Sequence, residues 1–341
     1  MKTLHDLWKR GQDFLGVHYP LMCGAMTWIS ESHFVSAVSN SGAFGCLAAG
    51  NLEPDILESE IEQAYKLTDN PFAVNLITIA PNFEHHLPIA VEKKVPFIIF
   101  GGGIPKASDI RMAKEGGAKV LCFASTESIA LRLIDHGSDA LMLEGSEAGG
   151  HIGHVSLAIL LQQVLFKVES VPIFVAGGIG SGQLIPHLLL MGAAGVQLGT
   201  RFVPTDECNA HPKFKEAFIK ARARDAIATP HVGSELQVVA VRALRNKGME
   251  QFAELQLSLI QLRRRGEFTQ QEAQLEVEKY WIGSLRRAVL DGEVSRGSLM
   301  AGQSVGLVNR IQPLQEVIDE LLEDARYELK RIKDRIKKRI I

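Results

Sequence analysis

The stretch that decides the fold is residues 172–202, PIFVAGGIGSGQLIPHLLLMGAAGVQLGTRF. It starts with a short apolar run that stops at glycines, continues with a helical pattern, and ends with a second apolar run that also stops at a glycine. Residues 96–125 repeat this order of proline, apolar run, glycine cluster, helix and new apolar run. Strands that alternate with helices form a parallel sheet covered on both faces. The stretch therefore predicts one unit of a βα repeat.

Eight such apolar runs follow one another along the chain. They begin at Tyr19, Phe44, Phe72, Pro96, Lys119, Asp139, Pro172 and Gly195. Helical patterns lie between them, for example at residues 55–67, 108–117 and 183–193. Eight βα units are the number that closes a (β/α)8, or TIM, barrel. An open doubly wound sheet would instead carry a GxGxxG turn after its first strand and an acid after its second. The chain has neither mark, so we predict an α/β fold with a TIM barrel over residues 17–225.

The last barrel helix is expected in residues 211–225, with Pro212 in its first turn. After it, residues 226–296 predict a mainly helical insertion, or lid, that follows the eighth strand. A helix over 249–265 ends in arginines and Gly266, and Thr269 begins a second helix with a capping-box pattern.

Two features of this insertion and of the C-terminus complete the expected organisation. Apolar side chains fall on one face of each insertion helix: Phe252, Leu255, Leu259 and Leu262 in the first, and Val277, Trp281 and Leu285 in the second. Residues 297–341 are expected to return to the barrel and to end in an amphipathic helix with a basic face. A solvated end helix and a membrane-surface or partner-binding role both remain open for it.

The composition excludes several classes of protein. Of 341 residues, 46% are hydrophobic and 22% charged, and the net charge of −2 gives no general attraction for nucleic acid. The four cysteines form no CxxC pair and no Cys–His metal spacing, which favours reduced thiols, a cytoplasmic location and no metal site. No apolar stretch reaches the ~18 residues of a membrane span.

Active sites of such barrels lie at the C-terminal ends of the strands. The residues at those ends are Gly24, Ala25 and Met26 after strand 1, Asn75 in strand 3, Glu144, Gly150 and His151 after strand 6, Gly177 and Gly178 after strand 7, and Gly199 and Thr200 after strand 8. The returning C-terminal segment adds Gly302 and Gln303.

Two glycine-bearing turns suggest a phosphate site. They are AGGIGSG at residues 176–182 and LGTR at residues 198–201. Barrels often bind phosphate between the loops after strands 7 and 8, where glycines let backbone N–H groups approach the oxygens. Each loop alone could be only a tight βα turn. Together, in these two positions, they favour a phosphate site.

No side chain in this set is a strong nucleophile. A bound cofactor that supplies the reactivity would suit it, and a phosphate-bearing flavin fits the two loops. His151 could then move a proton. The alternative for His151 is a loop residue that caps a backbone group.

Three segments resemble the nitronate monooxygenase family, formerly called 2-nitropropane dioxygenases, and its relatives, the flavin-containing enoyl-acyl-carrier-protein reductases. The segments are EGSEAGGHIG (144–153), VAGGIGSG (175–182) and GAAGVQLGTRF (192–202), and the resemblance extends from about residue 17 to 310. It implies an FMN-dependent barrel enzyme with His151 as the catalytic residue. It also implies a set of FMN contacts: the phosphate at Gly177, Gly178, Gly199 and Thr200, the flavin ring along Gly24, Ala25 and Met26, further contacts from Asn75, Glu144 and Gly150, and closure of the site by Gly302 and Gln303.

The chain departs from the pattern of the monooxygenases at two places. It has Gly-Ala-Met where they usually show Ala-Pro-Met, and Glu144 where many carry Gln. Glu144, Trp28 and residues 207–225 look closer to the enoyl reductases. The resemblance thus implies a nitronate or an enoyl thioester as the small-molecule substrate, with O2 or NAD(P)H as the co-substrate.

Three functions follow from the sequence. We place oxidation of alkyl nitronates by O2 first, because the family is mostly assigned that way. NAD(P)H-dependent enoyl reduction is second, and a non-catalytic barrel that binds a phosphate ligand is third. A homodimer is among the assemblies that the sequence allows.

Overall fold

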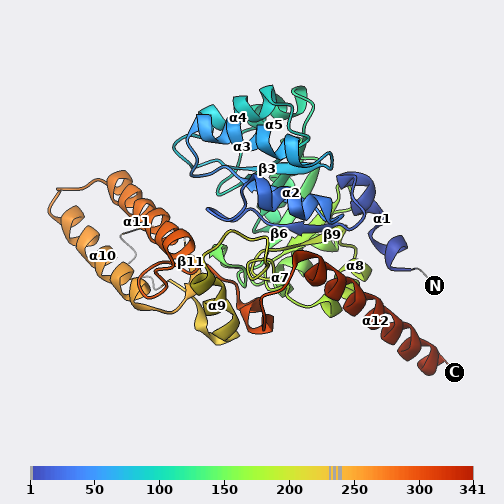
Figure 1. Cartoon of the computed structure of the whole chain (residues 1–341). Coiled ribbons are helices and arrows are strands. Elements are labelled where there is room, and N and C mark those ends of the chain that lie inside the picture. The colour runs from blue at the N-terminus through green and yellow to red at the C-terminus, as the bar shows by residue number, and fades with distance from the viewer. Residues whose placement is uncertain (1–2, 230–231, 233–235, 237–239, 341) are drawn as a thin grey trace.

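The computed structural model of the chain describes residues 3–229, Val232, Leu236 and residues 240–340 (Figure 1). Eight parallel strands alternate with helices along it. The strands are β1 (Leu21–Cys23), β2 (Gly45–Ala48), β3 (Phe72–Ile77), β4 (Phe97–Gly101), β5 (Lys119–Ala124), β6 (Ala140–Glu144), β8 (Ile173–Ala176) and β9 (Gly195–Leu198). The helices between them are α2 (Ser32–Asn40), α3 (Pro54–Leu67), α4 (Phe83–Glu92), α5 (Ala107–Glu115), α6 (Glu127–Asp135), α7 (Leu157–Leu160) and α8 (Ile185–Leu190).

The sheet closes on itself. Its strand order is β1-β9-β8-β6-β5-β4-β3-β2, so β1 and β2 lie at its two edges. A parallel bridge between Met22 and Phe44 joins these edges, and the amide nitrogen of Cys23 lies 2.9 Å from the carbonyl oxygen of Phe44. Each of the eight apolar runs contains one strand, and the predicted (β/α)8 barrel is confirmed.

Alternate residues of each strand face two different cores, as the two-residue period of a strand requires. The inner core fills the barrel with side chains that include Met22, Phe44, Ile99, Met142 and Phe174, and α1 (Leu4–Leu15) contributes Leu15 to it. The outer core packs the other strand face against the helices. Towards the C-terminal ends of the strands the inward positions become polar or small, and this change leaves space for a site.

The insertion after the barrel is mainly helical. A short hairpin, β10 (Ala226–Ala228) and β11 (Val241–Leu244), leads into α10 (Lys247–Arg264) and α11 (Gln270–Asp291), which lie together to one side of the barrel (Figure 1). The predicted start of the second helix is correct, because Thr269 and Glu272 form the capping box. The apolar faces also pack as expected: Phe252, Leu259, Val277, Trp281 and Leu285 are buried, and Leu255 and Leu262 are partly buried.

Two helices differ from the expectation for the C-terminal part. The helix expected over 211–225 is α9 (Pro212–Lys220), which ends early because the chain turns at residues 223–225. Helix α12 (Leu314–Ile340), and not α9, packs against α8, the 3-10 turn η2 (Gly182–Leu184) and α1. Its first half buries an apolar stripe of Leu314, Val317, Ile318, Leu321, Leu322 and Ala325, and its end extends away from the barrel (Figure 1). The structure thus seats the start of the predicted end helix on the barrel.

Candidate active site

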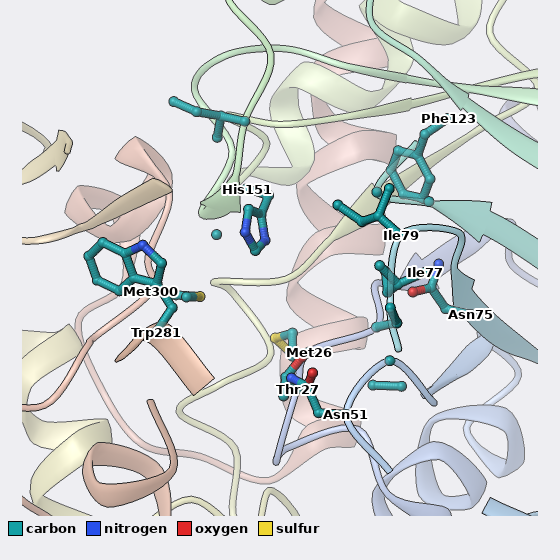
Figure 2. Close-up of a pocket in the computed structure, with 18 of the residues that line it drawn as sticks. Met26, Thr27, Asn51, Asn75, Ile77, Ile79, Phe123, His151, Trp281 and Met300 are labelled. Atoms are coloured by element: carbon teal, nitrogen blue, oxygen red, sulfur yellow. The ribbon is translucent and has the colours of Figure 1, made fainter. Parts of the chain in front are cut away.

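A cavity of about 1040 Å³ opens at the C-terminal ends of the barrel strands. Barrel loops form one side of it, and α11 and the returning segment at Met300 form the other (Figure 2). Eight of the residues chosen from sequence line this cavity: Ala25, Met26, Asn75, Glu144, Gly150, His151, Gly199 and Thr200. The other five, Gly24, Gly177, Gly178, Gly302 and Gln303, are not among its lining residues.

The floor of the cavity is the top layer of the barrel interior. Asn75, Glu144 and Gln197 point inward from β3, β6 and β9, in the phase of the inner core. The Asn75 amide donates to the carbonyl oxygen of Ile99 at 3.1 Å, which fixes its orientation. Neighbouring inward positions carry small residues, among them Gly101, so that the polar groups stay accessible from the cavity.

Burial raises the pKa of the Glu144 carboxyl to about 8. Near neutral pH this side chain is therefore largely a protonated acid, which can both donate and accept a hydrogen bond. The Asn75 amide offers the same mixture of donor and acceptor. The pair suits a planar heterocycle with alternating N–H and C=O groups, such as the ring of a flavin.

The segments predicted to hold a phosphate meet behind the cavity. The Gly302 amide donates to the Thr200 hydroxyl at 3.0 Å, and the Gln303 amide donates to the carbonyl oxygen of Glu147 at 3.0 Å. Gly178, with a φ of 73°, approaches the same loop: a Cβ at this position would lie 3.1 Å from the Cβ of Glu147. The returning segment therefore contacts the loops after β6 and β9.

Gly177 and Gly199 lack a side chain for different physical reasons. Gly177 has a φ of 89°, and a Cβ there would lie 2.7 Å from the carbonyl oxygen of Gly145. Its glycine is thus required by the fold. Gly199 has an ordinary φ, and the nearest atom to a Cβ there would be the Met26 sulfur at 3.6 Å. The fold does not require glycine at Gly199, which faces the cavity, so its lack of a side chain points to a ligand that approaches the backbone.

Gly24 supports the floor rather than lining it. Its amide donates to the carbonyl oxygen of Leu198 at 2.9 Å, and its carbonyl accepts from the Ser30 hydroxyl at 3.2 Å. A Cβ at Gly24 would lie 3.0 Å from the Gln197 amide nitrogen. A larger residue at this position would therefore displace Gln197, which does line the cavity.

His151 lies on a strand that joins the barrel to the insertion. Strand β7 (Gly150–His151) pairs antiparallel with β11, in the register His151 to Val241. The Ile152 amide extends the pairing by donating to the carbonyl oxygen of Ala240 at 2.9 Å. Figure 2 shows the imidazole between Ile79 and Phe123 on one side and Trp281 and Met300 on the other. The insertion thus places the histidine inside the cavity.

The Arg242 side chain contacts the loop after β6. Its guanidinium donates to the carbonyl oxygen of Ser146 at 3.0 Å and to that of Ala226 at 2.8 Å. One side chain therefore ties the glycine-rich loop after β6 to the first strand of the insertion.

Sequence reasoning missed several residues of the site. Gln197 lines the cavity, and its signal was a lone polar residue inside the apolar run GVQLG. Asn51 also lines it, directly after Gly50 at the end of the second strand. Lys279 and Gln271 come from α11, and no local pattern marks them as lining residues.

Cysteine and metal chemistry find no support in the described part of the chain. Cys46 lines the cavity, but burial raises the pKa of its thiol, so that the reactive thiolate is disfavoured. Burial also raises the pKa of Cys122, to about 12. Within residues 3–229, 232, 236 and 240–340, no group of three or more His, Cys, Asp or Glu side chains could hold a metal ion. Within the same residues no helix is long and apolar enough to cross a membrane.

Comparison with known proteins places this site in context. A family profile described as nitronate monooxygenase matches residues 9–86 and 77–324. A (3aS,4S,5R,7aS)-5-hydroxy-7a-methyl-1-oxo-octahydro-1H-indene-4-carboxyl-CoA dehydrogenase from Mycobacterium tuberculosis is 27% identical over 92% of this chain and 94% of its own. A probable nitronate monooxygenase from Staphylococcus aureus is 28% identical over 73% of this chain and 82% of its own.

The chain also superposes on solved structures of known proteins. FabK from Thermotoga maritima superposes with a TM-score of 0.86 at 33% identity, covering 95% of this chain and 98% of that one. A nitroalkane oxidase from Streptomyces ansochromogenes superposes with a TM-score of 0.76 at 24% identity, covering 94% of this chain and 99% of that one, and it supports the fold alone.

Proposed function

Because this chain belongs to the nitronate monooxygenase family, we propose that it is an FMN-dependent oxidoreductase that reduces an enoyl thioester with NAD(P)H. The size of the cavity carries this choice of substrate. Its volume of about 1040 Å³ lies at the upper end of the ~300–1,000 Å³ usual for a ligand pocket, which leaves room for a substrate beside the cofactor. A thioester with an acyl chain would fill more of that space than a small nitronate would.

Two of the relatives support a thioester. The mycobacterial relative is named as a dehydrogenase of a carboxyl-CoA compound, which is a thioester, and it aligns with 92% of this chain. FabK of Thermotoga maritima shares 33% identity and the whole fold, including 95% of this chain. The probable nitronate monooxygenases align with less of it, 73%.

The residues present fit FMN. The backbone amides around Gly178 and Gly199 and the Thr200 hydroxyl would hold its phosphate, while Asn75 and Glu144 would meet the polar edge of its ring. When bound, FMN supplies two-electron transfer between NAD(P)H and the substrate. The site shows no feature for an adenylate, so we expect FMN and not FAD to be released by heat.

The side chains of the protein would bind the thioester, exclude water and handle one proton. Reduction of the double bond adds a hydride to the β-carbon and a proton to the α-carbon, and NAD(P)H becomes NAD(P)⁺. His151 would polarise the thioester carbonyl or assist protonation of the α-carbon, and its position among the cavity-lining residues supports this role. Trp281 and Met300 contribute apolar groups on one side of it and Ile79 on the other (Figure 2).

Oxidation of a nitronate by O2 is the second candidate function. Its supporting observation is that the imidazole of His151 faces an open cavity, where it could remove the α-proton of a neutral nitroalkane. Sequence alone placed this function first. The volume of the cavity and the share of this chain that aligns with the CoA-linked relative favour the thioester over the nitronate.

One pair of assays tests the proposal. With the FMN-loaded protein, NADH and NADPH oxidation is followed with crotonyl-CoA and with a 2-decenoyl thioester, and O2 uptake is followed with propyl-2-nitronate. We expect thioester-dependent oxidation of one pyridine nucleotide and slow O2 uptake. Rapid O2 uptake with inert thioesters would establish the second candidate instead, and no turnover in either assay would leave a binding protein.

A further inference from the structure

Glu147 lies in the loop after β6, between Glu144 and His151, but it does not line the cavity. The Leu157 amide donates to both of its carboxylate oxygens, at 3.0 and 3.3 Å. Leu157 is the first residue of α7. The Glu147 side chain therefore ties the loop that carries His151 to the start of the next helix.

This contact takes the place of an ordinary helix cap. Ser156, at the N-cap of α7, belongs to a residue type that commonly caps a helix, but its side chain accepts no capping hydrogen bond. The first N–H groups of a helix have no partner within the helix, and the helix dipole favours a negative charge beside them. A carboxylate from another part of the loop thus caps α7 instead of the local serine.

Two glycines leave space for Glu147. A Cβ at Gly145 would lie 2.5 Å from Oε2 of Glu147 and 2.7 Å from the Leu157 amide nitrogen. A Cβ at Gly302 would lie 2.8 Å from the carbonyl oxygen of Glu147. Neither glycine has a positive φ, so the backbone conformation does not require it. The space that Glu147 occupies therefore excludes a side chain at Gly145 and helps to exclude one at Gly302.

Further contacts close the same loop. The Ser146 amide donates to the carbonyl oxygen of Val155 at 2.9 Å, and Arg242 donates to the carbonyl oxygen of Ser146 at 3.0 Å. Burial lowers the pKa of the Arg242 guanidinium, and the charge of Glu147 raises it, so the two side chains interact electrostatically. His151 lies near the middle of the segment that these contacts close.

From these contacts we propose that Glu147 is a positioning residue, which holds His151 in the cavity by accepting the Leu157 amide. The inference rests on the proposed function and adds a residue that acts through His151. Because Glu147 does not line the cavity, its loss should slow the step in which His151 takes part and leave substrate binding unchanged.

Two substitutions in the FMN-loaded protein test the inference. Glu147→Ala removes the acceptor, so kcat with the preferred enoyl thioester should fall by about 10- to 100-fold while KM changes by less than about twofold. Glu147→Gln keeps an oxygen that can accept the Leu157 amide, so its kcat should return to within about threefold of the wild type. A kcat for Glu147→Gln as low as that of Glu147→Ala, or a wild-type kcat in both, would overturn the inference.

Glu31→Ala is the matched control. The Glu31 carboxylate accepts the Phe34 amide at 2.9 Å and the His33 amide at 3.0 Å at the start of α2, so this variant also removes a carboxylate cap from a barrel helix. Both alanine variants should lower the Tm by a similar amount, about 2–4 °C, but Glu31→Ala should keep the wild-type kcat. Equal losses of kcat in the two variants would mean that Glu147 acts through stability alone, and would overturn the inference.

Hydrogen exchange separates this inference from the proposed function, because it needs no turnover. In Glu147→Ala the amides of Ser146, Ile152 and Leu157 should exchange at least about tenfold faster than in the wild type, with wild-type rates in Glu147→Gln and Glu31→Ala. If every thioester is inert but this pattern appears, the proposed function is wrong and Glu147 still positions the loop of His151. Wild-type exchange in all variants would overturn the inference whatever the enzyme reduces.

Discussion

Three polar side chains, those of Asn75, Glu144 and Gln197, occupy inward strand positions that apolar groups fill elsewhere in this barrel. Natural barrels fill such positions with branched apolar residues. Asn75 makes a hydrogen bond to the carbonyl oxygen of Ile99, and all three side chains line the cavity. Their polarity at one end of the strands therefore suits a ligand that forms hydrogen bonds with them.

The first test concerns His151. We expect His151→Asn to bind FMN as the wild type does, because the flavin contacts assigned above lie on other side chains. With the preferred substrate, kcat should fall by the ~10²–10⁴-fold typical of a lost general acid or base. Stopped-flow and steady-state assays measure this loss. If a neutral nitroalkane is a substrate, its rate should fall further than the rate with preformed nitronate. Rates near wild type on all substrates would assign His151 to loop capping.

The second test uses the buried acid. The folded-state pKa of Glu144, about 8, lies above its ordinary value near 4.3. The folded state therefore binds the proton more tightly, so the contribution of this group to the unfolding free energy is fully present below pH ~4, is lost as the pH rises to about 8, and is constant above that. In the cofactor-free protein we expect a loss of about 2–4 kcal/mol between pH 5 and pH 9 from this group.

Glu144→Gln should remove that part of the loss, because an amide does not titrate. Urea unfolding at pH 5 and pH 9 measures it, with the exposed Glu323→Gln on α12 as the control. If the unfolding free energies of the wild type and of Glu144→Gln depend on pH in the same way, the Glu144 carboxyl is well solvated.

The third test places a charge on the cavity floor. Gly199→Asp should fold, since its φ is ordinary and the Met26 sulfur is 3.6 Å from the added Cβ. It should lose FMN, because a carboxylate near the phosphate repels it by several kcal/mol in a partly dry site. Flavin absorbance after reconstitution is the readout, and Gly283→Asp on α11, where a Cβ meets only the Arg287 side chain at 3.6 Å, is the control. Full FMN occupancy in Gly199→Asp would show that the phosphate binds elsewhere.

Residues of the site could be predicted wherever a glycine or a polar residue ends an apolar run. This rule found Asn75, Glu144 and Thr200, and the structure places all three on the cavity wall. It could not find Leu275 or Lys279, because a helical residue faces the cavity only through the way α11 packs on the barrel. That packing depends on contacts distant in sequence.

At the scale of elements, strand β7 is the piece that couples the two halves of the site. β7 has two residues and β11 has four, which is too short for a clear period-two pattern, so neither strand could be predicted. The strands of the barrel and the helices of the insertion were predictable because they are longer and carry caps such as Thr269. The packing of α12 rather than α9 beside α8 could not be predicted, since both helices have an apolar face.

Arg242 allows this coupling to be tested. Arg242→Ala removes the hydrogen bond to Ser146 in the loop after β6 and the one to Ala226 in β10, so we expect His151 to become less well placed. FMN binding should persist, while kcat falls by about tenfold. Hydrogen exchange of residues 145–152 should rise in the same variant. Arg265→Ala, at the exposed end of α10, is the control, and equal kcat values in both variants would show that the loop needs no such support.

At the scale of the whole molecule, α12 divides into two parts. The part from Leu314 to Leu329 buries its apolar face against the barrel, and Arg201 in the loop after β9 donates to Glu320 at 2.5 Å. The described side chains from Asp334 to Lys338 are exposed. The first part should support folding, and the second should not.

Two truncations test this division. A stop after Lys333 should leave the Tm within about 2 °C and the kcat unchanged. A stop after Pro313 removes more than five buried aliphatic side chains at ~1.5–3 kcal/mol each, a loss comparable to the whole stability of ~5–15 kcal/mol. That protein should be insoluble or unable to retain FMN. Differential scanning calorimetry and flavin content are the measurements, and a stable, flavin-loaded short form would contradict the division.

The contact between Thr200 and Gly302 also orders events during synthesis. The two residues are 102 positions apart, a distance that a ribosome covers in about 5–20 s at 5–20 residues per second. All eight strands have emerged before the segment that contacts the loop after β9 exists. A nascent chain in this interval has all eight strands but an unfinished cavity wall, so we expect flavin capture to follow completion of the polypeptide.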